Sequence, residues 1–151
     1  MRSQFMDQMK LAMKAGDKAR TGAIRLIIAA LKEKDIEARG AGRGEASNEE
    51  ILGVLQKMIK QRQESAEVFD KGGRPELAAG ERGEVAVISS FLPEQMSDDA
   101  VKAAIAAAIA ETGAASMKDM GKVVASLRGQ FAGRMDFGKA SGLVKAALSG
   151  G

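Results

Sequence analysis

Residues 47–71 read SNEEILGVLQKMIKQRQESAEVFDK, and this stretch predicts the fold class of the whole chain. Its apolar residues recur mainly at intervals of three and four, which is typical of a helix with one buried face. Ser47 and Glu50 have the spacing of a capping box, in which each side chain accepts a hydrogen bond from the backbone N–H of the other residue. Gly72 and Gly73 end the pattern. We therefore expect one long helix between Ser47 and Gly72.

The same apolar spacing continues on both sides of this stretch, so the chain is predicted to be all-α. Asp, Ser or Pro marks the start of most of the other helices, and Gly marks many of their ends. Gly80 and Gly83 lie inside one expected helix, which predicts either a kink or a shorter helix there. The six further helices are expected at about 3–15, 17–39, 75–92, 97–113, 116–129 and from 136 onward.

Pro93 divides the chain into two expected domains. The proline ring removes a backbone donor and disfavours α geometry at Leu92, so no helix should run through this point. We predict an N-terminal four-helix domain at 1–93 and a small three-helix domain at 97–151, with a hinge between them. The second domain is near the lower size limit for independent stability, so we expect it to lean on its neighbour or on a partner.

The composition lacks most of the usual catalytic groups. The 151 residues contain no His and no Cys, which excludes thiol nucleophiles, disulfide bonds, the usual zinc sites and an imidazole base. The apolar volume comes from Ile, Leu, Val, 9 Met and 27 Ala, with only 5 Phe and neither Trp nor Tyr. We therefore expect no catalytic residue, no metal and no cofactor.

Residues 133–140 read GRMDFGKA, which matches the phosphate-binding loop G-x-x-x-x-G-K up to its final position. That motif needs a Ser or Thr hydroxyl for magnesium and a strand that leads into the loop. Ala140 has no oxygen in its side chain, and a helical pattern precedes Gly133. We interpret the stretch as a turn between two helices, with Asp136 as the cap of the second.

The chain is mildly basic, with a formal net charge of +3 and a pI near 9.3. In the helix expected at 17–39, Lys18, Arg25 and Lys32 recur every seven residues. By itself this pattern indicates a solvated face whose cations are offset by acids about one turn away, such as Asp35 near Lys32.

The last third of the chain has a local excess of positive charge. After Gly113 there are six Lys or Arg residues, and the acids are only Asp119 and Asp136. A small helical unit of this kind can meet phosphates through Lys, Arg and helix N-termini, but without Tyr, Trp or His it has little to stack on unpaired bases. We therefore expect recognition of RNA shape and backbone rather than base sequence.

No membrane segment is expected. The longest apolar run, from Ala103 to Ala110, is far shorter than the roughly 20 residues of a bilayer-spanning helix. The first ten residues, MRSQFMDQMK, lack the apolar core of a signal peptide. These observations predict a cytoplasmic protein.

Four blocks of sequence carry a family resemblance. They are MKAGDK at 13–18, LQKMIKQRQES at 55–65, FLPEQMS at 91–97 and TGAASMKDMGKV at 112–123. Together, and in this order, they resemble the GatB/YqeY family, in particular its stand-alone YqeY-like members. The resemblance implies an all-helical protein whose C-terminal domain is similar to the tail of the B subunit of the glutamine-dependent aminoacyl-tRNA amidotransferase. In that enzyme the tail helps to hold the tRNA.

The resemblance also implies limits on function. The family carries the label of carbon–nitrogen ligases with glutamine as amide donor, but the parts of the amidotransferase that activate the tRNA and hydrolyse glutamine have no counterpart in these residues. We therefore expect a non-catalytic, tRNA-associated protein. The stretch 116–122 is the best match to the tail-domain pattern. By this resemblance, the cations expected to contact the tRNA backbone are Lys118, Lys122, Arg128, Arg134 and Lys139.

A different class of function stays open at this point. The chain could instead be an accessory module that docks through its apolar faces on an amidotransferase or on an aminoacyl-tRNA synthetase. Contact with RNA would then be incidental.

Overall fold

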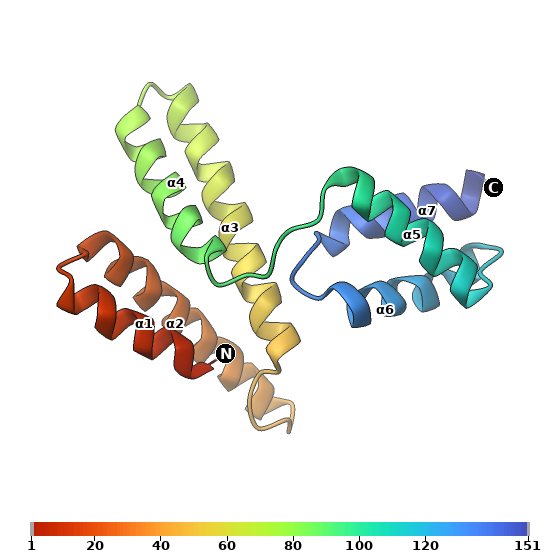
Figure 1. Ribbon diagram of the computed structural model, residues 1–151, viewed down its shortest axis with the longest axis horizontal. Helices are drawn as coiled ribbons and strands as arrows, with labels where there is room; N and C mark the ends of the chain where they lie inside the picture. The colour runs from red at the N-terminus through yellow and green to blue at the C-terminus, as the bar shows by residue number, and fades with distance from the viewer. Residues whose placement is uncertain (1, 151) are drawn as a thin grey trace. The chain divides into compact units, whose positions relative to one another are not determined.

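The computed structural model describes residues 2–150, and it confirms the all-α prediction (Figure 1). Within these residues there are seven α-helices, one 3-10 turn and no β-strand. Each expected helix is present, with ends that differ from the prediction by a few residues. The elements are α1 (Arg2–Lys14), α2 (Lys18–Gly40), α3 (Asn48–Lys71), α4 (Pro75–Ser89), α5 (Asp98–Thr112), the 3-10 turn η1 (Met117–Asp119), α6 (Met120–Phe131) and α7 (Phe137–Gly150).

The helices fall into two groups. Contacts within the chain separate the residues up to Leu92, called here the N-terminal unit, from the residues that begin at Pro93, called the C-terminal unit. The first contains α1 to α4, and the second contains α5, η1, α6 and α7. Each unit has its own buried apolar cluster. The boundary between the two groups lies at Pro93. The division into two domains, with the second leaning on its neighbour or on a partner, stays a prediction.

The N-terminal unit consists of two helix hairpins, α1 with α2 and α3 with α4 (Figure 1). Their inward faces form one buried apolar cluster, because the three-and-four spacing places these side chains on a single side of each helix. The cluster includes Phe5 from α1, Ile24 and Ile27 from α2, Leu55 from α3 and Ile88 from α4. Burial of these side chains joins the two hairpins.

Local signals in the sequence are confirmed at the helix ends of this unit. Ser47 Oγ accepts a hydrogen bond from the N–H of Glu50 at 3.2 Å, and the Glu50 carboxylate accepts one from the N–H of Ser47 at 3.3 Å. Asp17 caps α2 by accepting from the N–H of Arg20 at 3.0 Å. Gly16 has a φ of +72°, which a residue with a Cβ rarely adopts. The capping box at α3 and the glycine stop after α1 were both correctly predicted.

Helix α4 is shorter than the expected range of 75–92. It runs continuously through Gly80 and Gly83 and ends at Ser89. Of the two outcomes expected there, the structure therefore has the shorter helix. Both glycines are exposed, and a Cβ at either position would meet nothing within 4 Å. The packing of α4 on α3 and α2 offsets the low helix propensity of glycine.

The C-terminal unit packs α5, α6 and α7 around a second apolar cluster, which includes Ile105, Val123, Leu127 and Val144. At the start of α7 the Asp136 carboxylate accepts hydrogen bonds from the N–H groups of Gly138 and Lys139, at 2.8 and 3.2 Å. The stretch 133–140 therefore connects two helices, and Asp136 is the predicted cap.

No single helix among residues 2–150 is long and apolar enough to cross a membrane. Helix α5 and residues 117–131, which are bent by 98° relative to each other, together have the length and apolar composition of a membrane span. The apolar faces of these helices pack in the cluster of the C-terminal unit.

Candidate nucleic-acid interface

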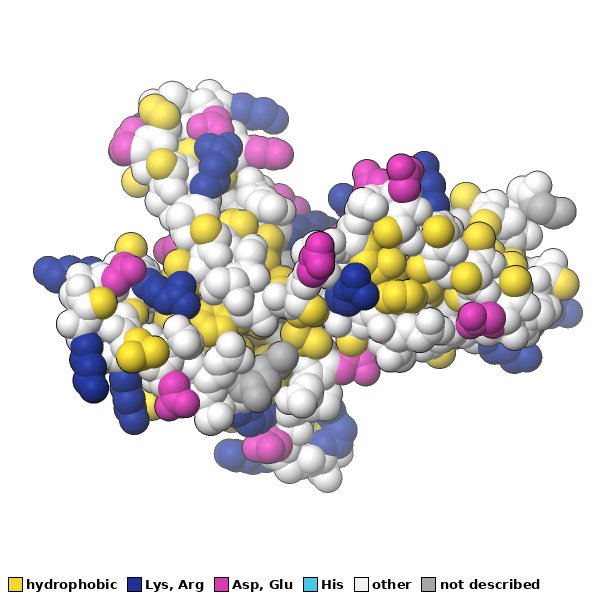
Figure 2. All heavy atoms as spheres, in the orientation of Figure 1, with side chains coloured by type: hydrophobic (Ala, Val, Ile, Leu, Met, Phe, Trp, Pro, Cys, Tyr) yellow, Lys and Arg dark blue, Asp and Glu magenta, His cyan; other side chains and the backbone are white. Residues whose placement is uncertain are grey.

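The five cations expected to contact tRNA follow α6 and the segments at its two ends. Lys118 lies in η1, Lys122 and Arg128 lie in α6, Arg134 lies in the turn after α6, and Lys139 lies in the first turn of α7. Arg134 is half-buried, whereas the other four side chains are exposed. On the face that Figure 2 shows, the Lys and Arg side chains of the C-terminal unit are spread singly rather than gathered in one patch.

The helix geometry separates these cations into two groups. An α-helix turns by about 100° per residue, so Lys122 and Arg128 point about 120° apart around the axis of α6. Lys118 lies in η1 directly before α6, Lys122 lies in the first turn of α6, and Arg128 lies in its last turn. A single ligand phosphate cannot bridge both groups, but a polyanion that follows α6 can contact them in turn.

Arg128 is held by an aromatic ring from the next helix. The guanidinium carbon of Arg128 lies 5.6 Å from the centroid of the Phe137 ring at the start of α7. A cation over a ring face is attracted by the ring quadrupole, and the N–H groups at the edge of the guanidinium stay free to donate. The contact therefore orients Arg128 without neutralising its charge.

Arg134 differs from the other four because it binds the segment that enters α5. Its Nε donates to the carbonyl oxygen of Glu94 at 3.0 Å, and its guanidinium carbon lies 5.9 Å from the Phe131 ring. The Arg134 carbonyl accepts from the N–H of Met96 at 2.9 Å, and Gln95 Nε2 donates to the carbonyl of Gly133 at 2.6 Å. Arg134 thus has a structural role that the sequence reasoning missed. The block FLPEQMS at 91–97, which contains these partners, was the available signal.

The two units differ in how their charges are paired. All seven ion pairs found within residues 2–150 lie in the N-terminal unit. In the described part of the C-terminal unit, no Lys or Arg has a carboxylate oxygen within 4.0 Å. The cations there are therefore available to an external anion at no cost of broken ion pairs.

Two acids of the C-terminal unit, Asp119 and Asp136, bind backbone amides. The N–H of Ala115 donates to Asp119 at 3.0 Å, and this bond lowers the pKa of the Asp119 carboxyl, helped by the N–H of Ser116 and the charge of Lys122. Asp136 accepts from the first amides of α7. Because the Asp136 carboxylate occupies the first amides of α7, that helix N-terminus is less suited to meet a phosphate, and side-chain cations are left for the task.

Family membership follows from comparison with known proteins. Residues 2–148 match the family described as Yqey-like protein, a match that includes both units. The chain belongs to the YqeY-like family. The four blocks quoted from the sequence therefore indicated the right family.

Curated relatives of this YqeY-like chain are fungal. It is 33% identical over 92 residues to "Altered inheritance of mitochondria protein 41, mitochondrial" of Saccharomyces cerevisiae, which is 61% of this chain and 48% of that protein. The protein of the same name from Lachancea thermotolerans is 33% identical over 84 residues, 56% of this chain and 43% of the relative. The YqeY-like chain thus spans about half the length of the curated relatives it matches.

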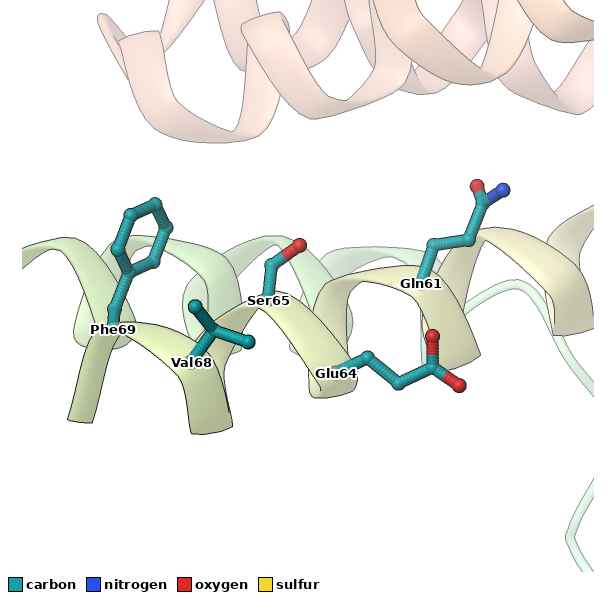
Figure 3. A pocket seen from close by; sticks show the side chains of 5 residues that line it. All are labelled: Gln61, Glu64, Ser65, Val68 and Phe69. Atoms are coloured by element: carbon teal, nitrogen blue, oxygen red, sulfur yellow. The ribbon is translucent and has the colours of Figure 1, made fainter. Parts of the chain in front are cut away.

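Two hollows lie in the N-terminal unit of the YqeY-like chain. One of about 360 Å³ lies along α3 and is lined by Gln61, Glu64, Ser65, Val68 and Phe69. In Figure 3, Gln61, Ser65 and Phe69 point to the same side of α3. Glu64 is the one titratable group among these five, so this hollow has no pair of groups for acid and base catalysis. Among residues 2–150, no three acidic side chains gather to hold a metal ion.

The charge pairing expected on α2 is wrong at Asp35. Arg2 donates to the two oxygens of Asp35 at 2.9 and 2.6 Å, and the N–H of Ala46 donates to Asp35 Oδ1 at 2.9 Å. The bonds from Arg2, followed by the one from Ala46, lower the pKa of Asp35 to about 2. Both oxygens of Asp35 are therefore used, and Lys32 has no carboxylate within 4.0 Å in the described chain.

Proposed function

We propose that this YqeY-like protein is a non-catalytic, tRNA-associated protein whose C-terminal unit contacts the tRNA backbone. The observation that supports this proposal best is the unpaired state of the cations along α6 and its flanking turns. In the N-terminal unit, by contrast, several Arg side chains are neutralised by carboxylates, such as Arg62 by Glu84 at 2.6 Å.

Backbone contact suits these side chains better than base reading. Lys118, Lys122 and Lys139 are exposed cations, and they can neutralise phosphates wherever the strand passes. The rings of Phe131 and Phe137 lie against Arg134 and Arg128, so they do not form a free platform for bases. The proposed contact is therefore with the shape of the folded tRNA.

The resemblance of the sequence to the tail of the amidotransferase B subunit supports the choice of tRNA over other polyanions. By this resemblance, the stretch 116–122, which contains Lys118 and Lys122, is the best match to the tail-domain pattern. We propose no ligase activity for the chain alone, because the parts that activate tRNA and hydrolyse glutamine have no counterpart in it. Incubation of the purified chain with glutamine, ATP and mischarged tRNA should yield no amidated product, and sustained product would contradict this part of the proposal.

The test of the tRNA contact is a double charge reversal, Lys118→Glu with Lys122→Glu. Both side chains are exposed and have no ion pair, so the variant should fold. The logarithm of the association constant for tRNA should fall with the logarithm of salt concentration, and in the variant this dependence should be weaker by about two units of slope. Fluorescence anisotropy with labelled tRNA over a salt series measures both quantities.

The matched control is Lys57→Glu with Lys60→Glu. These two lysines are exposed on α3 in the N-terminal unit, and they change the net charge by the same amount. The control should bind tRNA nearly as the wild-type chain does, with a small loss from the changed net charge. Equal losses in the two variants, or no loss in the first, would refute the proposed contact surface.

A further inference from the structure

One face of α2 carries cations and small side chains in alternation. Lys18, Gly22, Arg25, Ala29 and Lys32 follow each other at intervals of four and three, and all five are exposed. This spacing averages 3.5 residues per turn, close to the period of the helix, so the five positions form a nearly straight row. We call this row the α2 seam. It belongs to the N-terminal unit and is separate from the proposed tRNA contact.

The α2 seam is not neutralised by the protein itself. None of its three cations has a carboxylate within 4.0 Å in the described chain. Asp35 is bound by Arg2 and Ala46. Asp17, at the start of α2, uses Oδ1 to accept from the N–H of Arg20. Figure 2 shows Lys and Arg side chains gathered over the turn between α1 and α2, at the left of the view.

A hollow of about 470 Å³ lies beside the first half of the seam. Met13 of α1 lines it together with Lys18, Thr21, Gly22 and Arg25 of α2, and Gly16 and Asp17 line it at the turn between the two helices. A Cβ added at Gly22 would meet nothing within 4 Å, so the glycine leaves the hollow open. The Thr21 hydroxyl donates to the Asp17 carbonyl at 2.8 Å and is thereby satisfied. The hollow therefore has room for an apolar side chain, and it is lined by two cations, Lys18 and Arg25, and by one acid, Asp17.

Apolar exposure next to the cations favours a protein ligand over a nucleic acid. The Met13 side chain is 52% exposed beside the hollow. Ile36 continues the row four residues after Lys32 and is 65% exposed. Phosphates need only the cations, whereas a helical partner would bury these apolar groups as well. Methionine adapts its shape to the surface that it contacts.

The spacing of the cations specifies the chemistry of the partner. Residues seven apart on a helix are separated by about 10 Å along the axis. Carboxylates at every seventh residue of a second helix match this distance, and side chains between them would face Gly22 and Ala29. We propose that the α2 seam docks an acidic amphipathic α-helix of a partner protein, with its carboxylates on Lys18, Arg25 and Lys32 and an apolar side chain in the hollow at Gly22.

The experiment uses the full chain and a synthetic peptide of three heptads. The peptide has one glutamate in each heptad and one leucine between successive glutamates, and its control has lysine in place of each glutamate. Fluorescence anisotropy should show binding of the glutamate peptide and not of the lysine peptide. The triple variant Lys18→Glu, Arg25→Glu, Lys32→Glu should weaken binding about tenfold or more, because three ion pairs become repulsive. No binding of the glutamate peptide by the wild-type chain would overturn the proposal.

Two further variants separate seating in the hollow from simple attraction of charge. Gly22→Phe fills the hollow without changing any charge, so it should weaken binding, whereas Gly22→Ala should leave it intact. Unchanged binding by Gly22→Phe, with circular dichroism that shows a native helix content, would overturn the proposal. The control for charge is the triple variant Lys57→Glu, Lys60→Glu, Lys71→Glu, which changes three exposed lysines of α3. If it weakened peptide binding as much as the triple variant of the seam does, the proposal would be overturned.

Two further measurements separate the α2 seam from the proposed tRNA contact. The variant Lys118→Glu with Lys122→Glu should bind the peptide as the wild-type chain does, so the seam and the tRNA contact can fail separately. The wild-type chain could also bind tRNA but not the glutamate peptide, with tRNA affinity lost in the triple variant of the seam. That result would overturn the protein-docking proposal in favour of a second RNA contact.

Discussion

Asp35 joins three segments of the N-terminal unit at a single carboxylate. Arg2 of α1 and the N–H of Ala46, in the loop before α3, both donate to it. Arg2 also donates to the Ala46 carbonyl at 2.8 Å. These hydrogen bonds connect α1, the C-terminal half of α2 and the loop before α3. Arg134 fastens the C-terminal unit in a comparable way through the carbonyl of Glu94.

At the scale of the residue, we predict that Asp35 makes stability depend on acid. Its pKa is lowered from 3.8 to about 2 in the folded chain, so its stabilising effect is present above pH 3.8 and is lost as the pH falls toward 2. Chemical unfolding followed by circular dichroism measures the free energy of unfolding. Over this pH interval, that free energy should fall less for Asp35→Asn than for the wild-type chain. Other carboxylates, such as Asp70 beside Arg82, also lose stabilisation in acid, so the prediction concerns the difference between the two proteins. Identical pH profiles would contradict it.

At the scale of the element, the α3–α4 hairpin uses glycine in two conformations. Gly73 lies between the helices with a φ of +72°, a conformation that permits the sharp turn after Lys71. Gly80 and Gly83 lie inside α4 with ordinary helical geometry and open space around the position of a Cβ. The same residue type therefore serves the turn and weakens the helix.

We predict that alanine substitutions in this hairpin act in opposite directions. Gly80→Ala should stabilise the protein by up to about 1 kcal/mol, because alanine loses less backbone entropy in a helix and meets no clash. Gly73→Ala should destabilise it, because its Cβ is strained at a positive φ. Urea unfolding of the two variants measures the free-energy changes. Changes of the same sign would show that the conformations of these glycines do not control their effect.

At the scale of the whole molecule, two apolar clusters sustain two units. Ile24 and Leu55 are fully buried in the first cluster, and Val123 and Leu127 are fully buried in the second. Each cluster draws its members from one unit only. Each unit therefore has an apolar core of its own.

We predict that damage to one cluster stays within its unit. Leu127→Ala should destabilise the C-terminal unit by about 2–5 kcal/mol, because it leaves a cavity between α5, α6 and α7. Hydrogen exchange measured by mass spectrometry should show faster exchange in α6, with exchange in α3 unchanged. Ile24→Ala is the reciprocal variant and should have the opposite pattern. Faster exchange in both units after either substitution would show that they unfold together.

The features that could be predicted from the sequence are those that depend on neighbours along the chain. The capping box at Ser47, the cap at Asp136 and the glycine stop at Gly16 each involve groups within three residues of one another. The helical periodicity and the break at Pro93 are local for the same reason. The family blocks added the expected site residues, which local rules alone would not have chosen.

The sequence by itself therefore determined that the chain is all-helical and where its helices begin and end to within a few residues. Only the tertiary structure decided how the charges pair. Arg2 reaches Asp35 across 33 positions and Arg134 reaches Glu94 across 40, so neither partner could be chosen from spacing along one helix. Lys32 and the cations of α6 have no carboxylate within 4.0 Å in the described chain; of the acids near them in sequence, Asp35 binds Arg2 and Ala46, and Asp119 accepts from the N–H of Ala115.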